Sequence, residues 1–506
     1  MENNLPLGWV ETSLSSVVFF QEGPGLRTMQ MGLTGIPFLN IRTFNDDETL
    51  DKTKCKFVKI GEFNNRYEHF LLNEGDIVVS SSGTLGKAIV IRKEDLPVML
   101  NTSVIRFRTE SEKVVTQKYL KYFLKSDLFY KQIQEQKTGM AIDNYGPSHL
   151  QTMQILIPPI AEQHRIVEKL DAVMQKVESN KRRLAKIPKL LKRFRQSVLA
   201  AAVSGKLTEN WRMENPSLES GEAFMSKIKQ LRINRYDEAC KLAKKENKRK
   251  PSNYDNYEVN LRSDYDLFEI PEKWIWVDFR FLMSEDEPFC YGVVQPGGES
   301  VDGNYLIRAG DLKNNSVDTS SLRTISKAVD KEYSRSKVKG GEILITVVGA
   351  GIGECGIVPN SCAGYNIARA VAKVPIKDFD AKYLLNWLNS SFANKCMKDE
   401  AREVARPTLN LEQLRTIPIA LPSFEEQKEI VRIIEQLFAF SDKLEIRYTK
   451  AKALLDKIPQ SILAKAFRGE LISQNPNDEP ATALLERIKK EKEQAKEPKK
   501  KKPISK

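Results

Sequence analysis

The chain contains two copies of one segment, and this repetition constrains its fold more than any other feature. Residues 157–207 align with residues 421–471 at a constant offset of 264 positions and without a gap. Self-similarity at a fixed offset is the mark of a duplicated structural unit. We therefore predict two copies of one module, each with a mixed globular region of about 155 residues and a long helical segment. The matching positions include Pro158 and Pro422, Glu162 and Glu426, Gln163 and Gln427, and Gly205 and Gly469.

Both repeated segments have the apolar periodicity of a helix that packs against a partner helix. Apolar side chains recur at steps of three and four residues among charged neighbours, which is the pattern of an amphipathic helix. A continuous helix over residues 161–199 would be about 58 Å long, which is longer than one compact domain needs. We therefore predict that the two helices pair antiparallel and place the globular regions at opposite ends. The stripes comprise Leu170, Val173, Val177, Leu184, Ile187, Leu191, Phe194 and Val198 in the first copy, and Ile430, Ile434, Leu437, Leu444, Leu454 and Ile458 in the second.

Local signals mark the ends of these helices. Residues 423–426 have the spacing of a capping box, and a glycine, Gly205 or Gly469, follows each periodic run, where a left-handed C-cap favours glycine. Pro188 and Pro459 lie late in the two segments at non-equivalent positions. Each is predicted to kink its helix or to begin a new one, because proline cannot donate a backbone hydrogen bond.

The chain is predicted to have an α+β fold, in which two mixed α/β globular domains are joined by two long antiparallel helices that form a coiled coil. The two halves are related by a pseudo-two-fold internal repeat. Around residues 220–245 we expect a helix, followed by a flexible linker; such stretches can be docking arms or unstructured connectors. The predicted boundaries are 1–156 for the first globular domain, 157–207 for the first helical spacer, 208–263 for the linker with its helix, 264–420 for the second globular domain, 421–471 for the second spacer, and 472–506 for a C-terminal helix and a basic disordered tail.

Loops in the two globular regions carry residue types suited to reading DNA bases. In the first region, strand-like residues 77–79 and 88–91 flank a loop, and in the second, residues 343–345 precede a comparable loop. Loops on a rigid frame are the usual place for recognition residues, and Arg, Lys, Asn, Gln, Ser and Thr provide the donors and acceptors that match base edges. The predicted contacts are Asn40, Arg42, Ser81, Ser82, Thr84, Lys87, Asn101, Thr102, Asn144 and Tyr145 in the first region, and Arg308, Asp311, Thr346, Asn366, Arg369, Arg402 and Arg406 in the second.

The composition favours a polyanionic partner and gives no sign of a cofactor site. The formal net charge is +13, which attracts polyanions, although basic residues also serve solubility. The six cysteines include no CxxC pair, so neither a zinc site nor a disulfide framework is indicated. The GxGxxG pattern at residues 351–356 is followed by strand- and turn-forming residues, whereas a dinucleotide site requires a helix there. We predict no metal site and no cofactor in this chain, since P-loop, HExxH and GxSxG motifs are missing.

The N-terminus has neither a basic n-region nor an apolar core, and no apolar run is long enough to span a membrane. The sequence therefore predicts a cytoplasmic protein. A nuclease site made of scattered Asp, Glu and Lys side chains remains open, because such a site has no distinctive spacing.

The repeated segments, together with the Leu-Pro-Leu-Gly-Trp and Ile-Pro-Glu-Lys-Trp motifs at residues 5–9 and 270–274, resemble the specificity subunit of type I restriction-modification enzymes, in particular its EcoKI-like branch. The resemblance implies a non-catalytic bacterial or archaeal subunit whose two target-recognition domains read the halves of a bipartite, asymmetric DNA site. The helices would set the spacer and dock two modification subunits, which use S-adenosylmethionine to methylate adenine. Two restriction subunits would add ATP- and Mg-dependent translocation and cleavage. The residues predicted to dock partners are Glu162, Gln163, Arg193, Arg195, Glu426, Gln427 and Arg468.

Two other functions compete with this hypothesis. The chain could be a self-contained DNA methyltransferase or nuclease with fused recognition domains, although methyltransferase signatures are missing from the sequence. It could also be a coiled-coil scaffold with no role on DNA, which predicts no sequence preference in binding.

Overall fold

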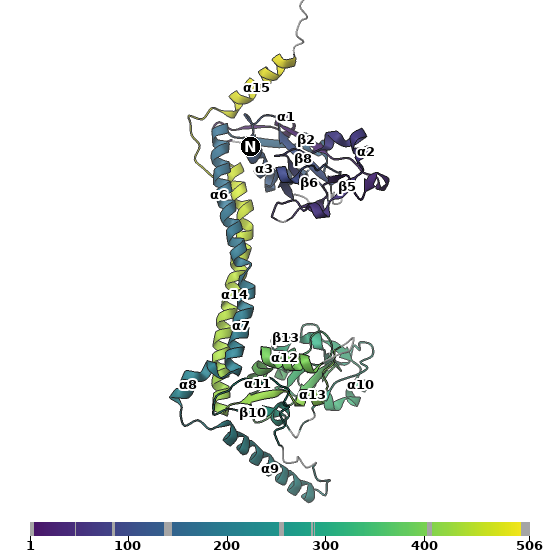
Figure 1. Cartoon of the computed structure of the whole chain (residues 1–506), viewed down its shortest axis with the longest axis vertical. Coiled ribbons are helices and arrows are strands. Elements are labelled where there is room, and N and C mark those ends of the chain that lie inside the picture. The colour runs from purple at the N-terminus through teal and green to yellow at the C-terminus, as the bar shows by residue number, and fades with distance from the viewer. Residues whose placement is uncertain are drawn as a thin grey trace, which may run out of the picture. The chain divides into compact units, whose positions relative to one another are not determined.

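The computed structural model describes residues 5–45, 47–82, 87–135, 144–251, 258–284, 287, 289–401 and 407–496 of the 506-residue chain (Figure 1). The chain divides into two compact units. Unit 1 comprises Met1–Ala185 and Thr449–Lys506, and unit 2 comprises Lys186–Tyr448. Each unit therefore contains one globular head and helical segments from both repeats. We call residues 5–157 head 1 and residues 258–421 head 2.

Head 1 is built on an antiparallel sheet with helices on one face. Its central strand, β6 (Ile77–Ser80), is buried at every position because successive side chains point to opposite faces. Ile77 and Val79 enter one apolar core, and Val78 enters another. The sheet has the order β2 (Val18–Glu22), β8 (Val104–Thr109), β6, β7 (Ala88–Val90). The other strands and helices are β1 (Val10–Ser13), β3 (Met31–Gly32), β4 (Ile36–Phe38), β5 (Lys56–Val58), β9 (Gln154–Ile157), α1 (Leu14–Val17), α2 (Ile60–Glu62), α3 (Gln117–Leu124), α4 (Asp127–Glu135) and α5 (Pro147–Gln151).

Head 2 repeats this plan with a wider sheet. Its central strand, β16 (Ile343–Thr346), is again buried throughout, with Ile343 and Ile345 in one core and Leu344 in another. The sheet has the order β11 (Cys290–Tyr291), β19 (Val371–Val374), β16, β17 (Cys355–Ile357), β14 (Ser316–Val317), β13 (Leu312–Lys313). The other strands and helices are β10 (Ile275–Asp278), β12 (Asn304–Ile307), β15 (Arg323–Ile325), β18 (Asn366–Ile367), β20 (Pro418–Leu421), α10 (Lys327–Glu332), α11 (Ala381–Leu388), α12 (Ser391–Glu400) and α13 (Leu411–Arg415).

In both heads the first and last strands pair antiparallel and lead directly into a long helix. β1 pairs with β9, with Val10 opposite Ile157, and β10 pairs with β20, with Ile275 opposite Leu421. The helices that follow are α6 (Ile160–Leu184) and α14 (Phe424–Phe467). This pairing brings the two ends of each head together at the base of its helix.

The long helices pair antiparallel within each unit, as predicted. In unit 1, Lys181 of α6 forms an ion pair with Asp456 of α14 at 3.2 Å, while Phe467 at the end of α14 packs against Tyr119 of head 1. In unit 2, Arg195 of α7 (Ile187–Val203) contacts both Asp442 and Glu445 of α14. The predicted stripes lie only partly in these contacts: Phe194, Leu454 and Ile458 are exposed.

The two prolines behave differently from one another. The first spacer is made of two helices rather than one continuous helix over residues 161–199, because α6 ends at Leu184 and α7 begins at Ile187. Pro188 lies in the first turn of α7, where its missing backbone donor costs nothing. Pro459 lies inside α14, which continues through it. Pro188 therefore begins a new helix as predicted, whereas no new helix begins at Pro459.

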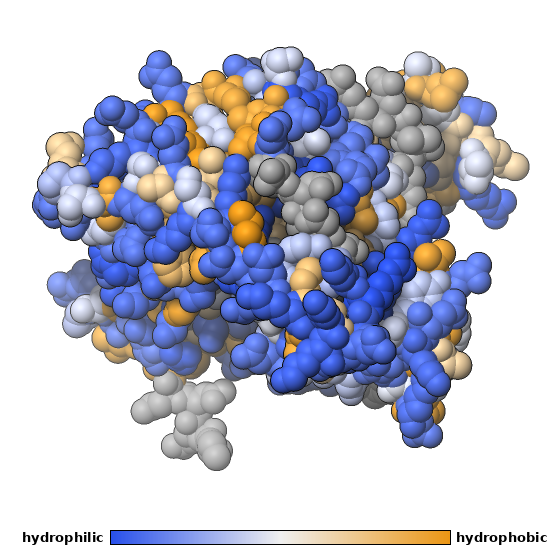
Figure 2. Space-filling model, turned by 90° about the horizontal axis from the view of Figure 1, so that it is seen from below, coloured by the Kyte–Doolittle hydropathy of each residue, from blue (hydrophilic) through white to orange (hydrophobic). Residues whose placement is uncertain are grey.

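The remaining helices follow the ends of the long ones. They are α8 (Glu209–Glu214) and α9 (Gly221–Lys245) after α7, and α15 (Ala481–Lys496) after α14. Figure 2 shows one face of the molecule, on which hydrophilic side chains predominate and hydrophobic ones form small islands. Among the described helices, none combines the length and the apolar character needed to cross a lipid bilayer.

The glycines that end the two repeats each pack against the proline of a short tryptophan-containing motif, at residues 5–9 in head 1 and residues 270–274 in head 2. We call these segments the head motifs. Gly205 and Gly469 have φ of 73° and 72°, and an added Cβ would lie 2.3 Å from Cγ of Pro271 and 2.5 Å from Cγ of Pro6, respectively. We expect Gly469→Ala to lower the free energy of unfolding by about 1–3 kcal/mol, because alanine is strained in the left-handed region and collides with the proline.

Chemical denaturation of the full chain measures this loss. Gly61→Ala is the matched control, since a Cβ there meets nothing within 4 Å. Equal stability of the two variants would contradict the proposed packing.

Candidate nucleic-acid interface

Four segments of head 1 meet at one end of its sheet. In the antiparallel order β2-β8-β6-β7, the last residues of β2 and β6 lie beside the first residues of β8 and β7. The backbone N–H of Ser81 donates to the carbonyl oxygen of Ser103, and the N–H of Tyr145 donates to that of Ser81, both at 3.0 Å. Ser82 forms a bridge with Asn144. We call residues 23–25, 81–82, 87, 101–103 and 144–146 rim 1.

Head 2 has the same backbone arrangement at the equivalent end of its sheet. The N–H of Val347 donates to the carbonyl oxygen of Ala370, and the N–H of Leu409 donates to that of Val347, both at 2.9 Å. Val348 forms the bridge, here with Thr408. We call residues 292–293, 347–354, 368–370 and 407–409 rim 2. The two rims therefore share their backbone hydrogen bonds but differ in their side chains.

A closely packed glycine after β2 in head 1, and one after β11 in head 2, supports each rim. A Cβ on Gly23 would lie 2.3 Å from the backbone N of Asn101, and one on Gly292 would lie 1.7 Å from the carbonyl oxygen of Ile367. Only glycine allows two backbone segments to approach so closely. The loop after β2 is thereby held against the loop that precedes β8, and the loop after β11 is held against β18, just before β19.

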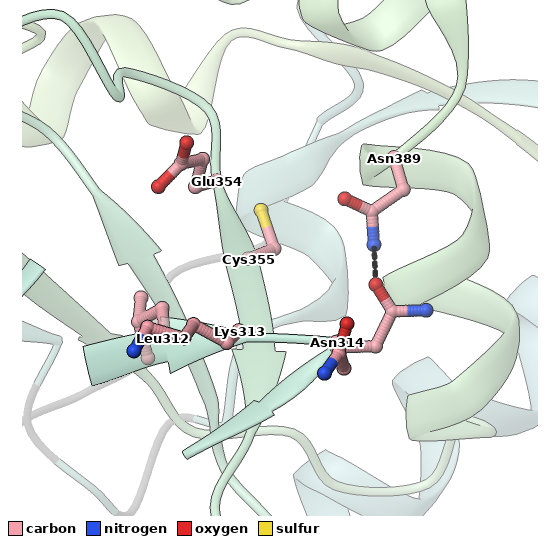
Figure 3. A pocket seen from close by; sticks show the side chains of 7 residues that line it. Leu312, Lys313, Asn314, Glu354, Cys355 and Asn389 are labelled. Atoms are coloured by element: carbon pink, nitrogen blue, oxygen red, sulfur yellow. Dashed lines mark hydrogen bonds between the residues drawn. The ribbon is translucent and has the colours of Figure 1, made fainter. Parts of the chain in front are cut away.

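A polar pocket of about 380 Å³ opens beside rim 2 (Figure 3). Asn314 and Asn315 have left-handed φ of 51° and 62° and form the turn between β13 and β14. The side-chain amide of Asn389, which follows α11, donates to Oδ1 of Asn315 at 3.1 Å. Burial raises the pKa of the Cys355 thiol at the back of the pocket, which favours the inert protonated form. The lining residues are Leu312, Lys313, Asn314, Asn315, Glu354, Cys355 and Asn389.

In head 1 a comparable contact between a turn and a helix end is made by charged side chains. Glu48, with φ of 64°, forms ion pairs with Lys121 and Lys125. Burial opposes ionisation of Glu48, but the two lysines outweigh it and lower the pKa of that carboxyl. Lys125 is equivalent to Asn389 at the repeat offset of 264. The Asn315–Asn389 pair in the pocket is therefore the head 2 equivalent of this structural contact between a turn and a helix end.

Within the described part of the chain, no cluster of three or more His, Cys, Asp or Glu side chains is placed to hold a metal ion.

Comparison with known proteins matches both repeats to one family. A family model described as "Type I restriction modification DNA specificity domain" matches residues 36–189 and 300–451. The chain is 34% identical to the EcoBI specificity subunit of Escherichia coli over 497 residues, covering 96% of this chain and 92% of that protein. It is 28% identical to the EcoKI specificity subunit of Escherichia coli strain K12 over 515 residues, covering 96% of each. The chain belongs to the specificity subunits of type I restriction enzymes.

Solved structures support the fold of this specificity subunit. One match is a chain from a study of complex assembly and conformational transition of the type I restriction-modification system, with a TM-score of 0.62 and 18% identity, covering 92% of this chain and 100% of that chain. Another is the HsdS subunit of Thermoanaerobacter tengcongensis, with a TM-score of 0.55 and 17% identity, covering 93% and 99%. The predicted family and the predicted α+β fold with an internal repeat are confirmed.

Most of the base contacts predicted in head 1 of the specificity subunit lie on rim 1. Thr102 and Asn144 are exposed there, and Ser82, Lys87 and Asn101 are partly exposed. These positions stay predictions, as does exposed Arg42, which lies apart from the rim in a short 3-10 turn capped by Asn40. Thr84 lies outside the described residues.

Ser81 and Tyr145 need correction, although both belong to rim 1. They are 1% and 2% exposed, and their backbones hold the rim together, so their side chains are not presented to a ligand. The aromatic ring of Tyr145 packs against Phe129 in the core. Sequence alone did not separate these framework residues from the surface residues beside them.

In head 2 Arg369 and Arg308 stay predictions, because both are exposed, although Arg308 pairs with Asp311. The structure corrects three other predictions. Arg369 is exposed on rim 2, at the place of Thr102 in rim 1. Arg402 and Arg406 lie outside the described residues. The corrected residues are polar groups that serve the framework: Asn366 is fully buried and bonded to Ser336, Asp330 and Tyr333; Asp311 is buried and bonded by the Arg308 guanidinium; and Thr346 is buried at the end of β16.

The Glu-Gln pairs at matched positions of the two repeats are buried and join parts of this chain to one another, which corrects their predicted role in partner docking. Glu426 is 2% exposed. Its carboxylate accepts hydrogen bonds from Nε1 of Trp274 at 2.9 Å, Oγ1 of Thr208 at 2.8 Å and Nε of Arg212 at 3.1 Å. Gln427 joins the helix to its head by accepting from the backbone N–H of Asp380 at 3.1 Å. Glu426 thereby fastens head 2 and α14 to a segment that follows the other repeat.

The first repeat has an equivalent buried Glu-Gln pair. Gln163 accepts from the backbone N–H of Thr116 at 2.9 Å and donates to the carbonyl oxygen of Val114 at 2.7 Å. Burial raises the pKa of Glu162, and the nearby Trp9 indole and a hydrogen bond from Nε2 of Gln474 at 3.4 Å partly offset this. Gln474 comes from the segment after the second repeat. The matched tryptophans, Trp9 and Trp274, were the sequence feature from which a contact between each head and the glutamate of its repeat could have been predicted.

The three arginines predicted to dock partners lie on or beside the helices. Arg193 is exposed on α7, and exposed Arg468 pairs with Glu470 at 2.7 Å. Both stay predictions. Arg195 is partly exposed and holds α7 against α14 through Asp442 and Glu445, so it has a structural role in the helix pair.

We predict that Glu426→Ala destabilises unit 2 by about 3 kcal/mol. The substitution leaves the Arg212 guanidinium and the Trp274 N–H without their buried acceptor, and breaking a buried ion pair from one side is costly. Glu425→Ala, at the exposed neighbouring position, should leave the denaturation midpoint nearly unchanged. A similarly small effect of both substitutions would show that the carboxylate does not fasten the unit.

Proposed function

We propose that this chain is the DNA-reading subunit of its restriction-modification complex, with rim 1 and rim 2 each reading one half of a bipartite, asymmetric site. The observation that carries the proposal is the repeated rim: one backbone frame in both heads, with different residues at the exposed and partly exposed positions. Ser82, Thr102 and Asn144 of rim 1 are replaced by Val348, Arg369 and Thr408 in rim 2. A constant frame with different side chains is what two heads need to read different bases from the same position on DNA.

We further propose that the helices dock two modification subunits, which in turn recruit two restriction subunits. Large apolar side chains exposed on the helices support this role, because exposed apolar patches mark protein interfaces. S-adenosylmethionine, ATP and Mg²⁺ would be bound by these partners, and this chain would contribute recognition without catalysis. The apolar side chains are Leu190 and Phe194 on α7, and Phe440, Ile446, Leu454 and Ile458 on α14.

Selection from a library of randomised duplexes tests the recognition role. The full chain, assembled with its modification subunits, should enrich a motif with two fixed parts and an unread gap. The purified chain alone should transfer no methyl group from S-adenosylmethionine to that duplex. Enrichment of no motif would contradict the recognition role, and methyl transfer by the chain alone would favour the self-contained methyltransferase.

Arg369 is the residue of rim 2 that we expect to contact a base directly. Arg369→Ala should lower the affinity for the selected duplex by about 1–3 kcal/mol and relax the preference at one base position, because a guanidinium can donate two hydrogen bonds to guanine. Affinity for a random duplex measured with the same variant is the internal control. An equal loss for both duplexes would instead assign Arg369 to a phosphate.

A further inference from the structure

Two short segments carry almost all of the net positive charge of the chain. Residues 221–250 hold ten Lys and Arg against four Asp and Glu, and residues 481–506 hold the same numbers. The rest of the chain has 60 basic and 59 acidic residues, although it includes both heads. Long-range attraction to a polyanion therefore originates mainly in these two segments.

The two segments occupy equivalent places in the two units. The N–H of Gly221, the first residue of α9, donates to the carbonyl oxygen of Lys273 at 2.7 Å, and the N–H of Ala481, the first residue of α15, donates to that of Gly8 at 2.9 Å. Both acceptors directly precede the tryptophan of a head motif. Duplication has therefore given each head one basic helix that starts from the same point. We call α9 and α15 the basic arms.

The first half of α9 is anchored to head 2. Phe224 and Ile228 are buried, Arg232 donates to the carbonyl oxygens of Phe281 and Met283 at 2.8 and 3.1 Å, and Arg235 forms a two-bond ion pair with Asp378. Asp378 lies after the C-terminal end of β19, whereas rim 2 lies at its N-terminal end. The arm is therefore attached at the end of the sheet opposite the rim.

The second half of α9 presents its basic side chains to solvent. Lys241, Lys244 and Lys245 have the three- and four-residue spacing of one helix face, and Lys248 lies three residues beyond the end of α9. All four lysines are exposed. Lys248 pairs with exposed Glu246, which is too weak a surface contact to occupy the face. On α15, Lys489 and Lys490 are exposed in the same way. Each arm thus combines a fixed base with a cationic end.

We propose that the basic arms bind the phosphate backbone of duplex DNA outside the bases read by the rims. This inference rests on the proposed function and adds a second mode of binding to it: the rims select the sequence, and the arms supply affinity that is independent of sequence. Lysines that neutralise phosphates release condensed counterions, so each contact makes binding more dependent on salt. The near balance of charge outside residues 221–250 and 481–506 leaves this contribution to the two segments that contain the arms.

The test replaces Lys241, Lys244, Lys245 and Lys248 with Gln in the full chain. Glutamine has nearly the helix propensity of lysine, so circular dichroism and thermal unfolding should be unchanged. The matched control replaces Lys186, Lys189, Lys192 and Lys206 with Gln, since these lysines are also exposed in unit 2. The affinity of each protein for a long random-sequence duplex is then measured as a function of salt concentration.

We expect the arm variant to bind roughly tenfold or more weakly at low salt, and its slope of log K against log salt to be shallower by up to about 3.6, or about 0.9 for each lost contact. The control should keep the parental slope. An unchanged slope in the arm variant, or equal changes in both variants, would overturn the proposal. Loss of partner assembly with an unchanged slope would also overturn it and assign the arms to a protein surface.

The same proteins separate this inference from the proposed function. The arm variant should retain the preference for the selected motif over random DNA, because the rims are intact. A parental chain without any motif preference would contradict the recognition role but would leave the salt comparison valid.

Discussion

Each unit of this specificity subunit depends on a buried carboxylate that fastens together parts distant in sequence. Glu426 joins the tryptophan of head 2, its own helix and the segment after the first repeat, and Glu162 has the equivalent place in unit 1. A buried carboxylate requires partners that satisfy its charge. The helix end and the following segment of the other repeat therefore supply part of the contacts that hold each head and its helix together.

Each unit is built from helices of both repeats, and this explains why the two repeated segments align without a gap. Each helical segment contributes to both units: α6 and the second half of α14 belong to unit 1, and α7 and the first half of α14 belong to unit 2. An insertion in either segment would shift the residues that meet the opposite head. The globular loops are under no such constraint, so their side chains can differ while the rim backbone is kept.

The sequence predicted the repeat, the antiparallel helices and the segments that form the rims, because these depend on periodicity and on matched positions. It predicted single contacts less well. Asn366, Asp311 and Ser81 have the residue types of a DNA-reading surface, yet each is buried in the framework, and residue type does not indicate burial. The Glu-Gln pairs were assigned to partners because their actual contacts, such as Thr208 with Glu426, are separated by 218 residues. The break before Pro188 and the uninterrupted α14 at Pro459 depend on local packing that periodicity does not report.

The central claim is that the two rims read the two halves of one site independently. Exchange of residues 1–156 for the corresponding domain of a related specificity subunit, followed by genome-wide mapping of methylated adenines in a host that carries the partner subunits, tests it most directly. Our account predicts that one half of the methylated motif changes and that the other half is retained. A change in both halves, or in neither, would contradict it.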